Sequence, residues 1–254
     1  MFKNTDKLSV SVLLGGIAAV FALRIYRAMS TKETKKATPT PTPKVAPAVG
    51  NKVWKVVLTG GPCGGKSSAL QSIMREMESL HIHVWSVPEI ATTFMLGGLK
   101  FTPEVAGNTS QMAKIQSAML RSQIQMEDNF EVIARAVGGD CLIVCDRGAC
   151  DAKAYCTPSE WAAVLASIPM TESQLLARYD GVLHLVSAAH GAEKFYTLEN
   201  NATRTETPQH ARELDDRVKN AYISHKKLCV VDNSTGFPDK LKRIVTELKG
   251  VMGK

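Results

Sequence analysis

The stretch that decides the fold is Val53–Ser67, which reads VWKVVLTGGPCGGKS. Its first seven residues are mostly β-branched and apolar, which predicts a strand buried on both faces. The residues that follow, Gly60–Ser67, match the pattern GxxxxGK[ST]. Residues 67–80 then have the apolar spacing of a helix. A strand, a glycine-rich loop and a helix in this order predict a phosphate-binding loop.

The spacing of this loop has a geometric reason. Glycines let the backbone curve so that successive N–H groups point at phosphates, at the positive end of the following helix. We expect Lys66 to reach the β- and γ-phosphates of a nucleoside triphosphate, and the Ser67 hydroxyl to bind Mg²⁺. The predicted nucleotide site consists of Gly60, Gly61, Pro62, Cys63, Gly64, Gly65, Lys66, Ser67 and Ser68.

A second strand is predicted at residues 81–88 (HIHVWSVP), and Glu89 follows it directly. In open α/β sheets the ligand binds beyond the carboxyl ends of the strands, so the Glu89 carboxylate should face the phosphate site. There it could accept a proton from a substrate hydroxyl. The alternative is that Glu89 caps the helix expected for the next residues, IATTF.

Residues 110–137 have helical apolar spacing and predict a long helix. We expect Arg121 and Gln123 on its solvated side, although either could line a cleft. The residues expected on its apolar side are Met112, Ile115, Met119, Ile124, Phe130, Ile133 and Val137.

A further buried strand, residues 141–145, ends at Asp146 and Arg147. Apolar residues before an acid form a Walker-B-type element, whose Asp holds the Mg²⁺ shell. Arg147 stands where ATPases that activate water commonly carry a second acid, and a basic residue there suits transfer to a bound acceptor better. Zinc binding is a weaker alternative, because the candidate ligands contain no CxxC pair. These candidates are Cys145, Cys150 and Cys156.

Two more apolar segments, residues 180–187 and 228–231, predict the fourth and fifth strands, and residues 240–251 predict a closing helix. The alternation of strands and helices predicts an α/β fold with a parallel five-stranded sheet and helices on both faces. The sequence contains no Asn-Lys-x-Asp and no Asp-x-x-Gly switch after the phosphate loop, which excludes an ordinary small GTPase.

Two arginines between the fourth and fifth strands are candidates for a lid. Arg204 lies in a polar loop, and Arg212 lies in a helix that begins at Thr207 as N-cap and Pro208 as first residue. Small kinases keep a phosphate-covering lid at this place. The alternative for Arg212 is an i,i+4 pair with Asp216.

The first fifty residues differ from the rest. Residues 8–23 carry no charge, and as a helix they would span about 24 Å, short of the roughly 30 Å of a bilayer core. An uncleaved signal anchor, a cleaved targeting segment and a buried helix all stay open. We favour an N-terminal membrane helix within residues 1–30, a Pro/Thr/Lys-rich linker at 31–50 and a P-loop nucleotide-binding domain at 51–254. More basic residues follow the apolar segment than precede it, which places this domain in the cytosol, with the mitochondrial outer membrane as a possible anchor site.

The formal net charge of +7 comes mainly from the N-terminal segment. Residues 1–50 hold eight of the 31 basic and two of the 24 acidic side chains, which leaves 23 basic and 22 acidic ones for the rest. A domain that binds nucleic acid needs its positive charge on the fold itself. We therefore expect no nucleic-acid partner.

Four segments together resemble one family. They are KVVLTGGPCGGKSS at 55–68, VPE at 87–89, VCDRG at 144–148 and VDNS at 231–234. The family is the NadR-like P-loop (AAA-type) domain family, which joins nicotinamide riboside kinases with the TRPL translocation defect proteins, and the resemblance covers residues 52–250. It implies a P-loop kinase-like fold that binds ATP or GTP together with Mg²⁺.

The resemblance also implies roles for individual residues. Ser67 and Asp146 would hold the metal, Arg147 would contact phosphate, and Glu89 would serve the acceptor. The catalytic set implied in this way is Lys66, Glu89, Asp146, Arg147, Arg204 and Arg212.

The sequence leads us to expect a membrane-tethered P-loop protein that transfers a phosphoryl group from ATP or GTP to a small acceptor such as a nucleoside or riboside. The alternative is a GTP- or ATP-dependent binding module in membrane trafficking, which binds phosphoinositide head groups with little turnover. A third interpretation is an NTPase at the mitochondrial surface, whose phosphate release would need no acceptor.

Overall fold

The computed structural model describes residues 52–196 and 207–254. The predicted membrane helix at 8–23, the linker at 31–50 and Arg204 lie outside these residues. No helix in the described part of the chain is long and apolar enough to cross a membrane.

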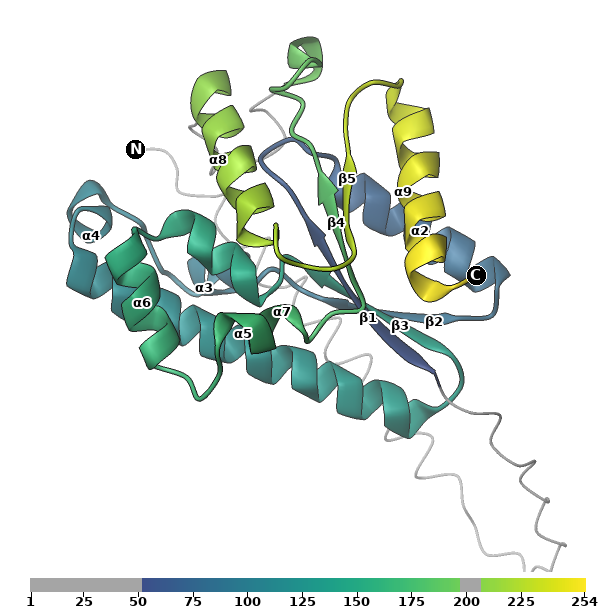
Figure 1. The fold of residues 1–254 in the computed structure, drawn as a ribbon, viewed down its shortest axis with the longest axis horizontal. Coiled ribbons are helices and arrows are strands. Elements are labelled where there is room, and N and C mark those ends of the chain that lie inside the picture. Colours follow the sequence, from purple (N-terminus) through teal and green to yellow (C-terminus); the bar gives the residue numbers. More distant parts are fainter. Residues whose placement is uncertain (1–51, 197–206) are drawn as a thin grey trace, which may run out of the picture. The chain divides into compact units, whose positions relative to one another are not determined.

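Five parallel strands form one sheet in the order β2-β3-β1-β4-β5 (Figure 1). The strands are β1 (Val53–Thr59), β2 (His83–Val87), β3 (Cys141–Asp146), β4 (Gly181–Leu185) and β5 (Leu228–Val231). The predicted parallel five-stranded sheet is confirmed. Because Asp146 pairs in register with Leu58, the acid leaves the sheet at the same edge as the phosphate loop. The chain enters β1 at the opposite edge, at Val53.

Helices α2 (Lys66–Ser79) and α9 (Phe237–Met252) cover one face of the sheet (Figure 1). Side chains alternate between the faces of a strand, so Val56 and Leu58 of β1 point to this face and Val57 points to the other. The largest fully buried side chains on this face are Leu58, Ile73, Met77, Leu142, Leu183, Leu185, Ile244 and Leu248.

The opposite face is covered mainly by α5, whose middle packs against β2 and β3. Several shorter helices lie beside α5 on this face, and α8 packs against one of them, η1 (Figure 1). The elements not yet given are α3 (Ile90–Leu96), α4 (Pro103–Ala106), α5 (Thr109–Val137), η1 (Ala149–Tyr155), α6 (Pro158–Ala166), α7 (Glu172–Leu176), η2 (Glu193–Phe195) and α8 (Pro208–Ala221).

The long helix α5 is present, but its buried side differs in part from the prediction. Ile133 and Val137 are exposed, so their expected burial is wrong. The buried side instead contains Gln123 and Glu127, which is fully buried. Glu127 can be buried because its carboxylate accepts hydrogen bonds from Arg178 and Tyr179, which follow α7, and from Gln123 on α5 itself. These bonds come from Arg178 Nε at 2.9 Å, Gln123 Nε2 at 2.8 Å and Tyr179 OH at 2.8 Å.

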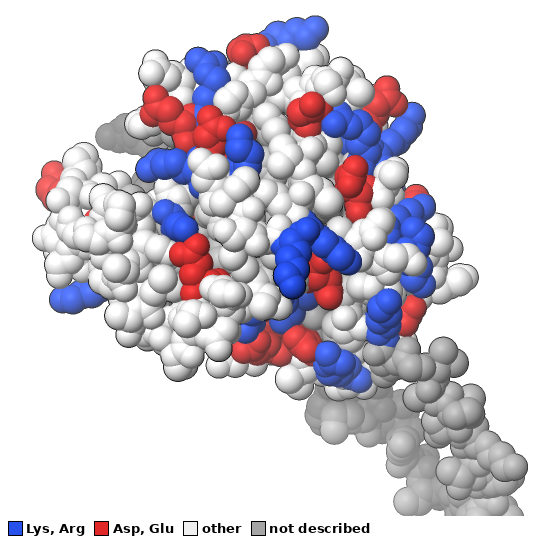
Figure 2. Space-filling model, in the orientation of Figure 1, with Lys and Arg blue, Asp and Glu red and all other residues white. Residues whose placement is uncertain are grey.

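Charges on the folded part are mixed. On the face shown in Figure 2, Lys and Arg side chains are interspersed with Asp and Glu side chains. This distribution is in line with the near neutrality of residues 51–254.

One ion pair joins the central strand to α5 and gives a test of the fold. The side chain of Lys55 on β1 is only 8% exposed, and its Nζ lies 2.8 Å from Oε2 of Glu131. Glu131→Gln leaves this buried ammonium without a charged partner. We expect the free energy of unfolding at pH 7 to fall by about 1–3 kcal/mol, measured by denaturant titration.

The same pair makes stability depend on pH. Hydrogen bonds from Lys55 and then from Arg135 lower the pKa of Glu131 from 4.5 to about 2. Its contribution is therefore complete above pH 4.5 and is lost as the pH falls toward 2. The difference between wild type and Glu131→Gln should disappear over this range. Arg135→Ala is the control, because Arg135 is 57% exposed and its i,i+4 pair is worth only about 0.3–0.5 kcal/mol.

Candidate active site

A cleft of about 1490 Å³ lies at the edge of the sheet where the phosphate loop and Asp146 leave the strands. Its walls come from residues 62–68, the start of α3, the middle of α5, the turn after β3, and the segments that follow β4 and β5. Pockets for one small ligand measure roughly 300–1,000 Å³. The cleft therefore has room for two ligands.

The phosphate loop begins in close contact with β4. Gly60 has a φ of 139°, and a Cβ at this position would lie 2.1 Å from the carbonyl oxygen of Leu185. Only glycine fits there. Residues 62–68 of the predicted nucleotide site line the cleft, whereas Gly60 and Gly61 lie behind them and are not among the described lining residues.

Lys66 is held on the carbonyl groups of its own loop. Its Nζ donates to the oxygen of Gly60 at 3.2 Å and to that of Gly61 at 3.5 Å. Burial and then the charge of Arg147 lower the pKa of Lys66 to about 8, although Asp146 acts in the opposite direction. Anionic phosphate oxygens would be stronger partners for this ammonium than neutral carbonyls.

Asp146 has the chemistry of a metal ligand. Its Oδ1 is buried and has no hydrogen-bond partner among the described residues. Burial raises the pKa of Asp146, Lys66 lowers it and Glu89 raises it further, with the net shift upward. Leaving a buried carboxylate oxygen unpaired costs free energy, which a cation would recover. Ser67 lines the same cleft, and the two oxygen donors fit Mg²⁺, which keeps much of its shell for water and phosphate.

The zinc alternative has no geometric support. Within the described ranges, no group of three or more His, Cys, Asp and Glu side chains could hold a metal ion. Cys145 and Cys150 are buried, and burial raises the pKa of both thiols. The thiolate form that zinc needs is therefore disfavoured.

Glu89 and Arg147 form a short ion pair in the cleft. Arg147 Nε donates to Glu89 Oε1 at 2.6 Å, and the Thr92 hydroxyl donates to Oε2 at 2.6 Å. Burial raises the pKa of Glu89, but Arg147, Thr92 and Lys66 together hold it below its ordinary value. The carboxylate is therefore ionised at neutral pH. Glu89 occupies the N-cap position of α3, as the capping alternative predicted, but its side chain makes no capping bond to the backbone and pairs with Arg147 instead.

Arg147 is fixed by its backbone as well as by its side chain. Its φ of 68° is left-handed, which is uncommon for a residue with a side chain and costs roughly 1–3 kcal/mol. Its N–H donates to Leu58 O at 3.1 Å, and its carbonyl accepts from Gln123 Nε2 at 3.2 Å. The guanidinium also donates to Asp151 Oδ1 at 3.2 Å and to Gly60 O at 3.3 Å. Together these hydrogen bonds hold Arg147 beside the phosphate loop and offset the cost of its backbone conformation.

Asp151 is the main residue of the site that the sequence did not reveal. Besides the bond from Arg147, its two carboxylate oxygens accept three more hydrogen bonds. The donors are the hydroxyl of Thr59 at 2.5 Å, the N–H of Gly148 at 2.8 Å and the hydroxyl of Tyr222 at 2.8 Å. Asp151 thus connects β1, the turn after β3 and the end of α8.

Gln116 was also missed as a site residue, and the expected solvated position of Gln123 is wrong, because Gln123 lines the cleft as the alternative predicted. Both are nearly buried on α5 and line the cleft. Gln123 is bonded to Glu127 and Arg147, whereas no hydrogen bond to the Gln116 amide is formed by the rest of the described chain. A signal was available, because Gln116, Gln123 and Glu127 share helical spacing with the apolar residues Met112 and Leu120.

The two candidate lid arginines have different outcomes. Arg204 lies outside the described residues. Arg212 is not among the described lining residues, and its guanidinium donates to Ala189 O at 3.0 Å. Its predicted alternative partner, Asp216, pairs with Lys219 instead, so that alternative is wrong. Thr207 does cap α8, accepting from the N–H of the third helical residue.

Comparisons with known proteins agree with this fold. The model of a family described as "AAA domain" matches residues 55–240. The structure of deoxyadenosine kinase from M. mycoides with bound dCTP is similar at a TM-score of 0.50 and 14% identity, over 77% of this chain and 99% of that chain. A structure of that kinase with bound dATP gives a TM-score of 0.46 and 13% identity over the same shares. At 14% identity, the first likeness concerns the fold alone. No curated protein sequence matches this chain.

Proposed function

The chain belongs to this AAA domain family, and from that premise and the cleft geometry we propose that it is a Mg²⁺-dependent phosphotransferase that acts on a small hydroxyl-bearing acceptor. The donor is ATP or GTP, and the acceptor is a nucleoside or riboside. The observation that carries the proposal is the Glu89–Arg147 ion pair, which lies in the same cleft as Lys66 and Asp146. This is the combination that phosphoryl transfer to a bound hydroxyl requires.

On the donor side, the proposal assigns the triphosphate to the loop of residues 60–68. Lys66 would exchange its loop carbonyls for β- and γ-phosphate oxygens. Ser67 and Asp146 would hold Mg²⁺, which supplies charge neutralisation at the phosphates when it is bound. The unpaired Oδ1 of Asp146 supports this assignment.

On the acceptor side, the Glu89 carboxylate takes the proton of the attacking hydroxyl. The acceptor oxygen forms a bond to the γ-phosphorus, the bond from this phosphorus to the β–γ bridging oxygen breaks, and ADP or GDP leaves with the electron pair. Arg147 stabilises the charge on the transferred group. Since Arg147 follows Asp146 where a water-activating acid could stand, the site favours a bound acceptor over water.

The chemistry of the remaining cleft supports a nucleoside-like acceptor. The wall formed by α3, the segment after it and α5 is mostly apolar, and Gln116 places a nearly buried amide in it. A glutamine amide can pair with a donor and an acceptor on one heterocycle edge. The apolar lining residues of this wall are Ile90, Ala91, Met95, Leu99, Phe101, Met112, Met119 and Leu120.

The membrane anchor, the cytosolic orientation and the kinship with nicotinamide riboside kinases and TRPL proteins belong to the same proposal and stay predictions. The anchor depends on residues 8–23. Phosphoinositide binding with little turnover is the outcome that would replace phosphoryl transfer.

The proposal is tested with the full-length protein in two steps. Thermal-shift titrations with ATP and GTP, each with and without Mg²⁺, should show a Mg²⁺-enhanced rise in melting temperature. A nucleoside and riboside panel should then give ADP or GDP only when the right acceptor is present. Stabilisation by GTP with phosphoinositide vesicle binding and no product would support the binding module. Phosphate release without any acceptor would support an NTPase.

A further inference from the structure

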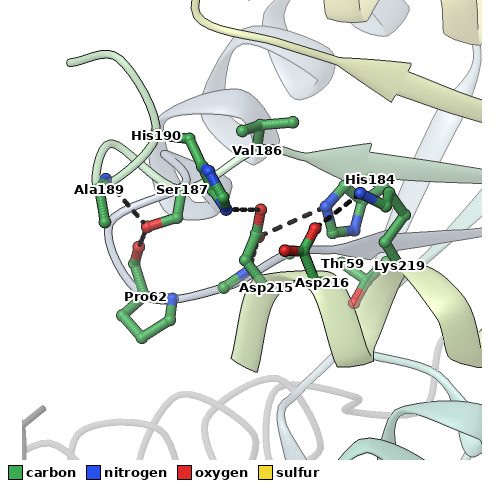
Figure 3. A network of polar contacts seen from close by, with 12 residues as sticks. Thr59, Pro62, His184, Val186, Ser187, Ala189, His190, Asp215, Asp216 and Lys219 are labelled. Carbon is green, nitrogen blue, oxygen red and sulfur yellow. Dashed lines mark hydrogen bonds and ion pairs between the residues drawn. The ribbon is translucent and has the colours of Figure 1, made fainter. Parts of the chain in front are cut away.

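A carboxylate outside every sequence motif contacts the phosphate loop, namely that of Asp215 on α8 (Figure 3). Asp215 is 2% exposed, and its Oδ1 accepts a hydrogen bond from the N–H of Gly61 at 2.6 Å. The same oxygen lies 3.3 Å from Nε2 of His184, and Oδ2 lies 3.7 Å from Nε2 of His190. Asp215 therefore joins α8 to the first turn of the loop and to the end of β4.

The contact between Asp215 and Gly61 is tight. A Cβ at Gly61 would lie 2.8 Å from both Cβ and Oδ1 of Asp215, so no side chain fits between the loop and the helix. Burial raises the pKa of Asp215, but His184 and the Gly61 N–H outweigh burial, and the pKa lies below its ordinary value. The acceptor is therefore ionised, and hydrogen bonds to ionised groups are the stronger ones.

As a charge, Asp215 opposes nucleotide binding. A carboxylate bonded to the phosphate loop repels the triphosphate, and burial weakens the screening of that repulsion. Attraction to the triphosphate therefore does not explain why a carboxylate lies against the phosphate loop. As an anchor for the Gly61 N–H, however, it fixes the loop before the nucleotide arrives, which reduces the ordering cost of binding. The charge of Asp215 lowers nucleotide affinity and its hydrogen bond to Gly61 raises it, so variants that remove one or both can separate the two effects.

Helix α8 also reaches the other walls of the cleft. Arg212, three residues before Asp215, donates to the carbonyl of Ala189. At the end of the helix, Tyr222 donates to Asp151, which in turn accepts from the guanidinium of Arg147. The position of α8 is therefore linked to the phosphate loop, to the segment after β4 and to the turn after β3.

We propose that Asp215 is a positioning residue of the nucleotide site, which holds the first turn of the phosphate loop in the conformation that receives a triphosphate. Through this bond, the loop depends on the position of α8. The inference rests on the nucleotide site of the proposed function and is independent of the acceptor.

The test measures ATP and GTP affinity, with Mg²⁺, in the full-length protein and in a matched set of variants. Asp215→Ala removes both anchor and charge, and we expect affinity to fall about tenfold. Asp215→Asn keeps an oxygen acceptor for Gly61 and removes only the charge, so affinity should stay within about threefold of wild type or increase. Asp216→Ala is the control, because this neighbouring side chain is 50% exposed and, within residues 52–196 and 207–254, its ion pair is with Lys219.

A second readout follows the loop itself. Amide hydrogen exchange at residues 60–65 should accelerate in Asp215→Ala and remain near wild type in Asp215→Asn. If the alanine variant does not fold, Asp215→Val takes its place, since valine fills more of the space but offers no acceptor to the Gly61 N–H, and the same loss is expected.

The outcomes separate the inference from the proposed function. An alanine or valine variant that binds nucleotide as tightly as wild type overturns the positioning role alone. An Asn variant as weak as the alanine variant overturns it as well, because the anchor would then not be what matters. A wild-type protein that binds neither ATP nor GTP overturns the nucleotide site and, with it, the inference.

Discussion

Lys66→Ala is expected to reduce kcat/KM for phosphoryl transfer by about 10³-fold or more, the effect of losing a fixed cation at developing phosphate charge. Nucleotide affinity should fall as well, because Lys66 is the cation bonded to the loop carbonyls at the cleft. The measurements are steady-state kinetics with the acceptor that the panel identifies and titration with ATP or GTP.

The same change should not destabilise the free protein. Burial lowers the pKa of Lys66 to about 8, which means that the unliganded fold disfavours the charged ammonium that nucleotide binding needs. We expect the melting temperature of Lys66→Ala without ligand to equal or exceed that of wild type. The control is Lys242→Ala, a 78% exposed lysine on α9, which should alter neither property. Full activity in Lys66→Ala would remove the phosphate-loop assignment.

Glu89→Gln is expected to lower kcat by about 10²–10⁴-fold, the usual contribution of a general base, with nucleotide affinity close to wild type. The glutamine oxygen can still accept from Arg147, and its amide N–H can donate to the Thr92 hydroxyl in place of the bond that Glu89 accepts there, so the local structure should persist. What it cannot do is take the proton of the acceptor hydroxyl. Single-turnover kinetics with bound nucleotide separate the chemical step from binding.

The comparison for this variant is Glu104→Gln, which changes an exposed acid in the first turn of α4. It should leave kcat unchanged. A Glu89→Gln enzyme with normal kcat would mean that Glu89 serves only to orient Arg147, and in that case Glu89→Ala should show the loss instead.

The parts of the fold that could be predicted are those whose physical cause is local in the chain. The run from Val53 to Ser67 contains the strand, the turn and the helix start within a few residues of one another, and Thr207 lies directly before the helix that it caps. Glu89 belongs to this group for another reason. It follows a strand, and the topology of open parallel sheets then places it at the ligand edge.

Two of the missed residues, Asp151 and Asp215, have partners that lie far away in the chain. Asp151 is held by Thr59 and Tyr222, which lie 92 and 71 positions away, and Asp215 is held by Gly61, 154 positions away. No periodicity in the sequence encodes such contacts. The burial of Glu127 on α5 has a similar origin, because its partners Arg178 and Tyr179 lie 51 and 52 positions away.

The direction of β1 has a practical consequence for handling the protein. The chain enters the sheet at Val53, whereas the phosphate loop begins after Thr59, so the two points are separated by a strand about 23 Å long. A bead or sensor chip coupled directly before Val53 would therefore lie on the side of the sheet away from the cleft. Immobilisation at this end should leave substrate diffusion into the cleft unobstructed. Attachment at the loops after β3 or β5, which line the cleft, should obstruct it.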